Sequence, residues 1–136
     1  SRTAEGLRTP RTPDYLAWRF SHPAVPYGWV ANRDATGGAV VRPGVRGDHP
    51  ETVLSDLLGS TEAADVHRVV RGSRAHHVAA FFSPGSPERR RSVAGGLIPA
   101  PWVKALRLVA LPLADTDLDP FDLRSWDLAT SDLELL

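Results

Sequence analysis

The hydrophobic residues of this chain fall into short, nearly continuous or alternating runs that are separated by polar, glycine and proline residues. Runs of this kind predict strands rather than long helices. The first two are joined by a tight glycine-containing connection, which indicates an antiparallel hairpin. The predicted strands are residues 27–34, 37–45, 51–59, 75–83, 103–114 and 125–136.

Three helices are expected between these strands, because cap residues stand directly before stretches with helical spacing. Thr12 before Pro13 predicts a short helix over residues 13–20. Ser60 or Thr61 can cap a second helix, whose valines recur at helical spacing up to a terminating glycine. Ser86 can cap a third, short helix in the same way.

The order of the elements predicts an α/β fold: helix, three strands, helix, strand, helix, two strands. A strand, helix and strand in succession imply a right-handed parallel crossover, while the early hairpin implies antiparallel neighbours. We therefore expect a mixed, mostly antiparallel twisted sheet with a central parallel crossover and flanking helices. Residues 1–11 are polar and without period, so we expect a flexible lead there and one domain over residues 12–136.

Charge and composition exclude several classes of partner. The chain has 16 Lys plus Arg and 16 Asp plus Glu residues, and this balance favours neither nucleic acid nor an anionic membrane as partner. Residues 115–136 contain seven acids and one arginine, so we expect this acidic end to pack near the basic body or to lie along an edge of the sheet. The absence of cysteine rules out disulfides and thiolate metal sites, and we expect a cytoplasmic protein.

Three stretches carry a resemblance to a known family: "RTPDYLAWRFSHPAVPYGWV", "VLSDLLG" and the ending "SWDLATSDLELL". Over residues 11–136 the chain resembles the later part of acetyltransferases of the GNAT superfamily, in particular their actinobacterial-type members. This resemblance implies a sheet that is splayed between its central parallel strands. It also implies that the pyrophosphate of acetyl-CoA sits on the N-terminus of the helix that follows the splayed strand.

The corresponding stretch here is "LLGSTEAAD", so the resemblance assigns cofactor binding to Leu58, Gly59, Ser60 and Thr61. Arg90, in the basic run "ERRRS", is the candidate clamp for the 3′-phosphate of the cofactor, because arginine binds phosphate bidentately. The alternative interpretation of both stretches is a capped helix start without a ligand and a solvated helix face.

Two acids, Glu62 and Asp65, stand in the first turn of this helix, where they would repel a pyrophosphate. Both tyrosines of the chain also lie far upstream of the position at which the family places its general acid. Two functions therefore stay open. The first is an acyl-CoA-dependent N-acyltransferase, or part of one; the second is a degenerate, non-catalytic domain of that fold that serves as an interaction or substrate-holding module.

Asp56 and His77 are the candidate catalytic residues. Asp56 is a charged residue within an otherwise apolar strand and would serve as a base or anchor for an acceptor amine if it faced the cleft. His76 and His77 are adjacent, so on a strand they point to opposite faces and cannot share one metal ion. One of this pair, taken as His77, could act as a base, and no metal site is expected from the spacing of the histidines.

The expected partners follow from the same interpretation. The acceptor would be a small-molecule or peptide amine. Only one short helix precedes the predicted hairpin, so the sheet would be incomplete at one edge. We therefore expect either that the domain is incomplete, as one part of a larger or tandem protein, or that a partner completes it. An open edge favours pairing with another strand, so the partner would be a second copy or a partner domain.

Overall fold

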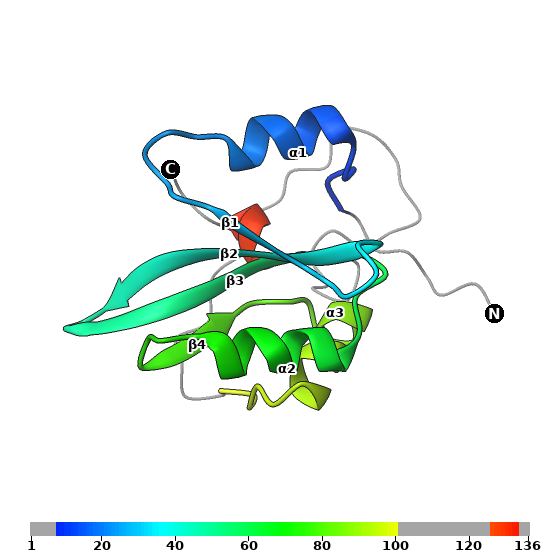
Figure 1. Cartoon of the computed structure of the whole chain (residues 1–136). Helices are drawn as coiled ribbons and strands as arrows, with labels where there is room; N and C mark the ends of the chain where they lie inside the picture. Colours follow the sequence, from blue (N-terminus) through cyan, green and yellow to red (C-terminus); the bar gives the residue numbers. More distant parts are fainter. Residues whose placement is uncertain (1–7, 101–125, 134–136) are drawn as a thin grey trace.

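The computed structural model describes residues 8–100 and 126–133, which form a four-stranded sheet with helices on both sides (Figure 1). The strand order is β1-β2-β3-β4, with β1 and β4 at the two edges. Helices α1 and α4 lie on one side of the sheet, and α2 and α3 lie on the other. The helices are α1 (Pro13–Phe20), α2 (Ala63–Gly72), α3 (Pro87–Ala94) and α4 (Thr130–Leu133); the strands are β1 (Gly28–Ala31), β2 (Gly37–Arg46), β3 (His49–Gly59) and β4 (His77–Ala80).

The first three strands form an antiparallel meander. β2 and β3 pair along their whole lengths and are joined by a two-residue turn, in which Gly47 has a φ of 61°. Positive φ at this position is what a tight hairpin turn requires, and glycine adopts it without strain. α2 then carries the chain back, so that β4 pairs in parallel with β3. The predicted hairpin of β1 with β2 and the predicted parallel crossover are confirmed, and the fold is α/β with a mixed sheet. The crossover was expected at the centre of the sheet, but among the described strands the parallel pair lies at one edge.

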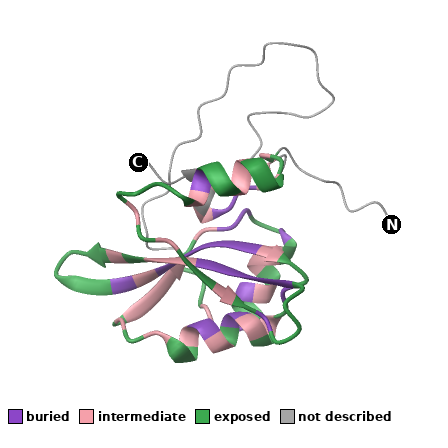
Figure 2. Cartoon of the chain, turned by 45° about the horizontal axis from the view of Figure 1, so that its top comes forward, coloured by how far each residue is buried: buried purple, intermediate pink, exposed green. Residues whose placement is uncertain are grey.

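The core lies between the sheet and α2 (Figure 2). Leu54 from β3 and Val66 from α2 are fully buried at its centre, with Ala39 from β2 and Phe82 around them. Val66 and Val69 are the buried residues of α2, as the helical spacing predicted. The helix-sheet interface thus follows directly from the apolar pattern of the second helix and the third strand.

Local caps explain where α1 and α3 begin. The Thr12 hydroxyl accepts a hydrogen bond from the Tyr15 backbone at 3.2 Å, and the Ser86 hydroxyl accepts one from Arg89 at 3.1 Å. Both caps are confirmed. The expected cap of α2 is wrong: the N-cap is Glu62, not Ser60 or Thr61, and the Glu62 backbone donates to Asp65 Oδ2 at 2.9 Å. An acid at the third helical position can close a capping box, and this interaction shifts the helix start.

Two further expectations need correction. The strand predicted over residues 75–83 is short and only half buried, because β4 ends at Ala80 and is an edge strand rather than one covered on both faces. The strand predicted over residues 125–136 is not a strand in its described part, because Thr130–Leu133 is a helical turn. The strand expected over residues 103–114 lies outside the described residues. Within the described ranges, none of the helices has the length and apolar character needed to cross a membrane.

Candidate functional site

The candidate site lies where β3 and β4 separate. The two strands pair over four residues of each, ending at Leu54 and Ala80. β3 continues to Gly59, whereas the chain after β4 forms an isolated antiparallel bridge between Phe82 and Ala129. The two parallel strands therefore stop pairing midway along β3.

A β-bulge in β3 stands at the same place. Val41 pairs with Leu54 and Val40 pairs with Asp56, so Ser55 is the additional residue on this strand. A bulge bends its strand and increases the local twist. The bend follows directly after the last pair with β4, and it gives a physical reason for the separation of the two strands. It also leaves Ser55 and Asp56 buried near the opening.

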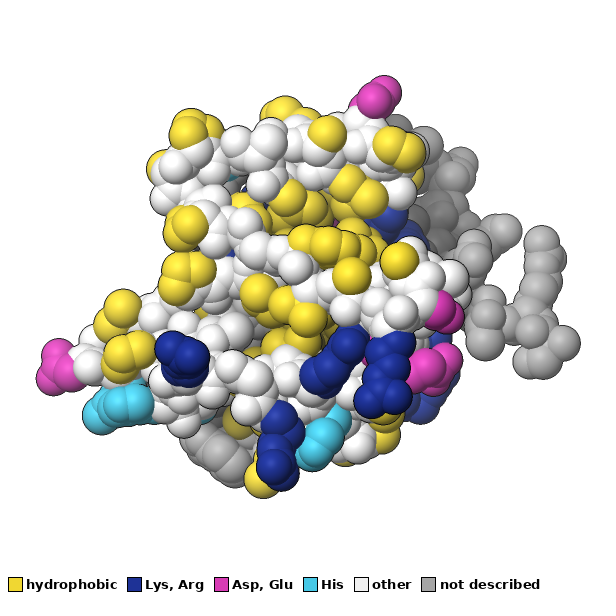
Figure 3. All heavy atoms as spheres, in the orientation of Figure 1, with side chains coloured by type: hydrophobic (Ala, Val, Ile, Leu, Met, Phe, Trp, Pro, Cys, Tyr) yellow, Lys and Arg dark blue, Asp and Glu magenta, His cyan; other side chains and the backbone are white. Residues whose placement is uncertain are grey.

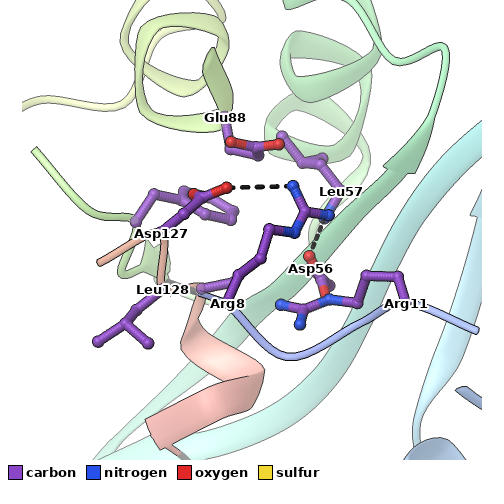
Figure 4. A pocket seen from close by; sticks show the side chains of 9 residues that line it. Arg8, Arg11, Asp56, Leu57, Glu88, Asp127 and Leu128 are labelled. Atoms are coloured by element: carbon purple, nitrogen blue, oxygen red, sulfur yellow. Dashed lines mark hydrogen bonds and ion pairs between the residues drawn. The ribbon is translucent and has the colours of Figure 1, made fainter. Parts of the chain in front are cut away.

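A small pocket occupies this opening (Figure 4). Asp56 and Leu57 line it from β3, and Asp127 and Leu128 line it from the C-terminal segment. The N-terminal segment contributes Arg8 and Arg11; Phe82, Glu88 and Ala129 complete the lining. The pocket therefore gathers residues from both ends of the described chain around the middle of the sheet.

Arg11 is the central group of the pocket, because it binds two carboxylates. Its Nε lies 2.8 Å from Asp56 Oδ2, and its Nη2 lies 2.9 Å from Asp132 Oδ2. The three side chains are between 4% and 11% exposed. Burial by itself would lower the pKa of Arg11, but the hydrogen bonds and charges of Asp132 and Asp56 outweigh it and raise this pKa above its ordinary value. Arg11 is therefore a buried, permanently charged clamp.

The remaining groups extend this network toward the surface. Asp132 Oδ2 also accepts a hydrogen bond from the Ala129 backbone at 2.9 Å, and Asp56 Oδ1 accepts one from the Leu57 backbone at 2.9 Å. Arg8 forms a more exposed ion pair with Asp127 at 3.1 Å. The predicted approach of the acidic end to the basic body is confirmed for these pairs. The flexible lead over residues 1–11 stays a prediction, although Arg8 and Arg11 at its end form ion pairs.

The free space in the pocket is small. Its cavity volume is about 10 Å³, which is about the room for one water molecule. The side chain of Glu88 points into this space from α3 (Figure 4), and its Oε2 atom is buried without a hydrogen-bond partner among the described residues. A pocket of this size has no room for an acyl thioester while Arg8 and Arg11 are in place.

The N-terminus of α2 is the position to which the resemblance assigns the cofactor pyrophosphate. The Ser60 backbone N–H donates to Thr36 at 3.3 Å, and the Thr61 backbone N–H donates to the Gly59 carbonyl at 3.0 Å. The next amide, that of Glu62, is occupied by Asp65. Free amide donors are what a phosphate cradle needs. The three residues directly before α2 therefore offer no free backbone donor to the pyrophosphate of acetyl-CoA.

The packing of the strands explains why position 59 is a glycine, without any ligand. Its φ is 65°, and a Cβ placed on it would lie 2.3 Å from the Thr36 carbonyl oxygen. The glycine therefore permits a close approach between β3 and the turn before β2. A cradle glycine would instead open toward free space, so this glycine belongs to the packing of the strands.

The other residues expected to hold the cofactor are dispersed. Leu58 is half buried in β3, and Ser60 is exposed, with its carbonyl bound by the Asn32 side chain at 3.0 Å. Thr61 is fully buried, and its hydroxyl has no partner among the described residues. Arg90 is exposed on α3 and donates to the Gly85 carbonyl of the preceding turn at 2.6 Å. Arg90 thus binds the turn before its own helix, and the Thr61 hydroxyl is buried rather than presented to solvent beside Gly59.

The two predicted catalytic residues do not come together. His77 pairs with Glu51 in the β3–β4 ladder, and its Nε2 lies 2.7 Å from Glu51 Oε2. Asp56 is five residues further along β3 than Glu51, which is roughly 16 Å of extended strand. Asp56 is bound to Arg11 in an ion pair, and His77 is hydrogen-bonded to Glu51. The two residues therefore have separate partners and do not face one substrate as an acid and a base.

Sequence reasoning did not anticipate Arg8, Arg11, Asp127 and Asp132 as site residues. The uneven charge along the chain was the available signal, and it contrasted the acidic C-terminal residues with the basic remainder of the chain without identifying pairs. The contact between His49 and His76 was also missed, because these residues are 27 positions apart and no spacing rule relates them.

No family model, no curated protein and no solved structure matches this chain.

Proposed function

We propose that this chain is a non-catalytic α/β domain of acyltransferase-like architecture that acts as an interaction module. The observation that carries the proposal is the Arg11 clamp, in which Asp56 and Asp132 hold a buried guanidinium in the opening between β3 and β4. The clamp fills the opening between the two parallel strands, which the resemblance predicts as a splayed, accessible part of the sheet. The occupied amides of Ser60, Thr61 and Glu62, directly before α2, support the same conclusion.

The edge strand β1 is the proposed contact surface. The Asn32 backbone N–H, directly after β1, donates to the Gly37 carbonyl at 2.9 Å. The backbone groups of successive residues in an antiparallel strand point alternately toward and away from the neighbouring strand. Those of Trp29 and Ala31 therefore point away from β2. The Arg68 side chain donates a hydrogen bond to the Ala31 carbonyl at 2.8 Å. The outward backbone N–H and carbonyl of Trp29 have no partner among the described residues. Exposed edge groups of this kind can pair with a strand from another chain.

The side chains of β1 favour such pairing. Edge strands are commonly protected by charged residues or proline. β1 reads GWVA and contains neither, and Trp29 is 53% exposed on it. Further hydrophobic side chains gather between α1 and the sheet on the face shown in Figure 3, and Trp18 on α1 is 68% exposed. We propose a second copy of the chain as the occupant, since two antiparallel β1 strands are self-complementary across a twofold axis.

The test of self-association is sedimentation velocity over a concentration series. The proposal expects a dimer whose dissociation constant rises at least tenfold in Trp29→Lys. Val45→Lys is the matched control, because Val45 is 71% exposed at the far end of β2 and should leave the dimer unchanged. A monomer at every concentration would remove the second copy as occupant. A dimer that is equally tight in both variants would place the contact elsewhere.

The second candidate function is acyl-CoA-dependent N-acyl transfer, which the separation of β3 from β4 favours. Calorimetric titration with acetyl-CoA at about 0.05 M and about 0.15 M salt decides between the two functions. The interaction module predicts flat heats at both. Micromolar binding that Arg90→Ala weakens would overturn the proposal and support a transferase, which an acceptor screen would then test.

A further inference from the structure

His49 and His76 form a close pair of imidazoles on the surface of the protein. Their Nδ1 atoms lie 3.0 Å apart, and the ring centroids lie 5.0 Å apart. Both side chains are exposed. We propose that this pair binds one divalent transition-metal ion through its two Nδ1 atoms. The proposal is independent of the interaction module.

The backbone fixes both residues. His49 is the first residue of β3 and pairs with Arg46 across the β2–β3 turn. His76 directly precedes β4, and its backbone N–H donates to the Pro50 carbonyl at 3.0 Å. The two Cα positions are therefore held by the sheet on both sides, and little chain entropy is lost when the rings close on an ion.

The spacing of the two nitrogens suits a shared metal ion. Imidazole nitrogens bind zinc at about 2.0–2.1 Å, which places two ligands roughly 2.9 Å apart at a right angle and roughly 3.4 Å apart at the tetrahedral angle. The observed 3.0 Å falls within this range. The nitrogens therefore need little change in their separation, and the rings need to rotate only until both Nδ1 lone pairs point at the ion.

Metal binding changes the tautomer of one imidazole ring but not the total number of protons on the pair. In the ion-free pair one Nδ1 donates a hydrogen to the other, so one ring carries its proton on Nδ1. Metal binding requires both Nδ1 lone pairs. That ring then releases its Nδ1 proton to water and takes one from water at Nε2, so that two neutral rings bind the ion without a net change in protons.

The neighbouring charged groups leave the pair open to the ion. The buried carboxylate of Glu51 is already bound by Arg46 at 3.0 Å and by His77 at 2.7 Å, so it is not a third ligand. The described residues gather no set of three or more His, Cys, Asp and Glu side chains that could hold a metal. Two histidines and water molecules would form the coordination shell. Imidazole ligands of this kind suit copper, nickel and zinc rather than magnesium or calcium.

The test is calorimetric titration of the untagged full chain with Ni²⁺ and with Zn²⁺, using Mg²⁺ for comparison. We expect one ion per chain for Ni²⁺ and Zn²⁺ and no heat with Mg²⁺. His49→Ala and His76→Ala should each weaken the affinity at least tenfold. His22→Ala is the matched control, because His22 is exposed in the connection between α1 and β1 and should leave the affinity unchanged. Circular dichroism checks that all three variants fold.

A spectroscopic measurement separates this site from diffuse binding to the other histidines. Ni²⁺ is paramagnetic, so substoichiometric amounts should broaden the ring resonances of His49 and His76 before those of His22 and His67. Uniform broadening of all histidines would overturn the proposal. So would equal affinities of the wild type and the two alanine variants, or the absence of measurable binding by the wild type.

Discussion

The Nε atom of Arg11, at the start of the described chain, lies 2.8 Å from Oδ2 of Asp56 in the middle of β3. The same guanidinium reaches Asp132 near the other end of the chain at 2.9 Å. Three segments that are distant in sequence thus meet at one buried cation. This relationship defines the candidate site, because it closes the opening between the two parallel strands.

The first prediction concerns this cation. Arg11→Leu should lower the free energy of unfolding by about 3–5 kcal/mol, because it leaves two buried carboxylates without their counter-ion. Urea unfolding measures the effect. Arg8→Leu is the control: Arg8 is 42% exposed in its pair with Asp127, and its loss should cost about 1 kcal/mol or less. Equal small effects in both variants would show that the Arg11 clamp does not hold the segments together.

The second prediction compares two glycines with similar backbone angles. Gly59→Ala should destabilise the protein by more than about 2 kcal/mol, because a Cβ would lie 2.3 Å from the Thr36 carbonyl oxygen. Gly47→Ala should cost about 1 kcal/mol, because a Cβ there meets no atom within 4 Å and only the positive φ opposes it. Thermal unfolding of the two variants measures the difference. If Gly59→Ala were the milder change, the close approach of β3 and the turn would be wrong.

The third prediction concerns the hydroxyl of Thr61. This side chain is fully buried, and its Oγ1 has no partner among the described residues. Thr61→Val removes that hydroxyl at nearly constant shape and should raise the free energy of unfolding by about 0.5–1.5 kcal/mol. Thr12→Val, which removes the working cap of α1, should instead lower it by about 1 kcal/mol. Destabilisation by Thr61→Val would mean that the hydroxyl has a partner, such as an ordered water.

The fourth prediction is a pH dependence. Burial by itself would raise the pKa of Glu51, but hydrogen bonds from His77 and Arg46 outweigh it and lower this pKa below its ordinary value of 4.5. A carboxylate whose pKa is lowered by folding stabilises the protein above its ordinary pKa. That contribution disappears as the pH falls through the lowered value.

The wild type should therefore lose more stability between about pH 6 and about pH 3 than Glu51→Gln does. Urea midpoints at the two pH values measure the loss. Asp48→Asn, which neutralises an exposed neighbouring acid, is the control and should follow the wild type. A Glu51→Gln protein with the same pH slope as the wild type would contradict the assignment.

Most of the sheet could be predicted from the sequence because its signals are local. Thr12 and Ser86 sit where side-chain oxygens cap helices, and alternating apolar runs between glycines describe the meander. The cap at Glu62 was missed because several residues before α2 could serve as caps, and the choice depends on how Ser60 and Thr61 are bound by neighbouring turns. The extent of β4 was missed because an apolar run does not say whether a strand is central or at an edge.

The candidate site was predictable only in part. Asp56 stood out as a charge in an apolar strand, and the acidic end of the chain suggested a basic counterpart. Their meeting at Arg11 depends on the bulge at Ser55, on the crossover through α2 and on the return of the C-terminal segment beside Phe82. The ion-pair partners are 45 and 121 positions apart in the sequence, so no local spacing pattern predicts them.

The sequence by itself determined the α/β class, the antiparallel meander and the parallel crossover, because these follow from apolar periodicity, caps and glycine turns within a few residues. The tertiary structure alone decided that Arg11 closes the opening between β3 and β4, that the amides before α2 are occupied, and that His49 faces His76. These contacts are set by which segments the packed sheet brings together. Charge attraction and hydrogen bonding act across space, so their partners are fixed only once the fold has formed.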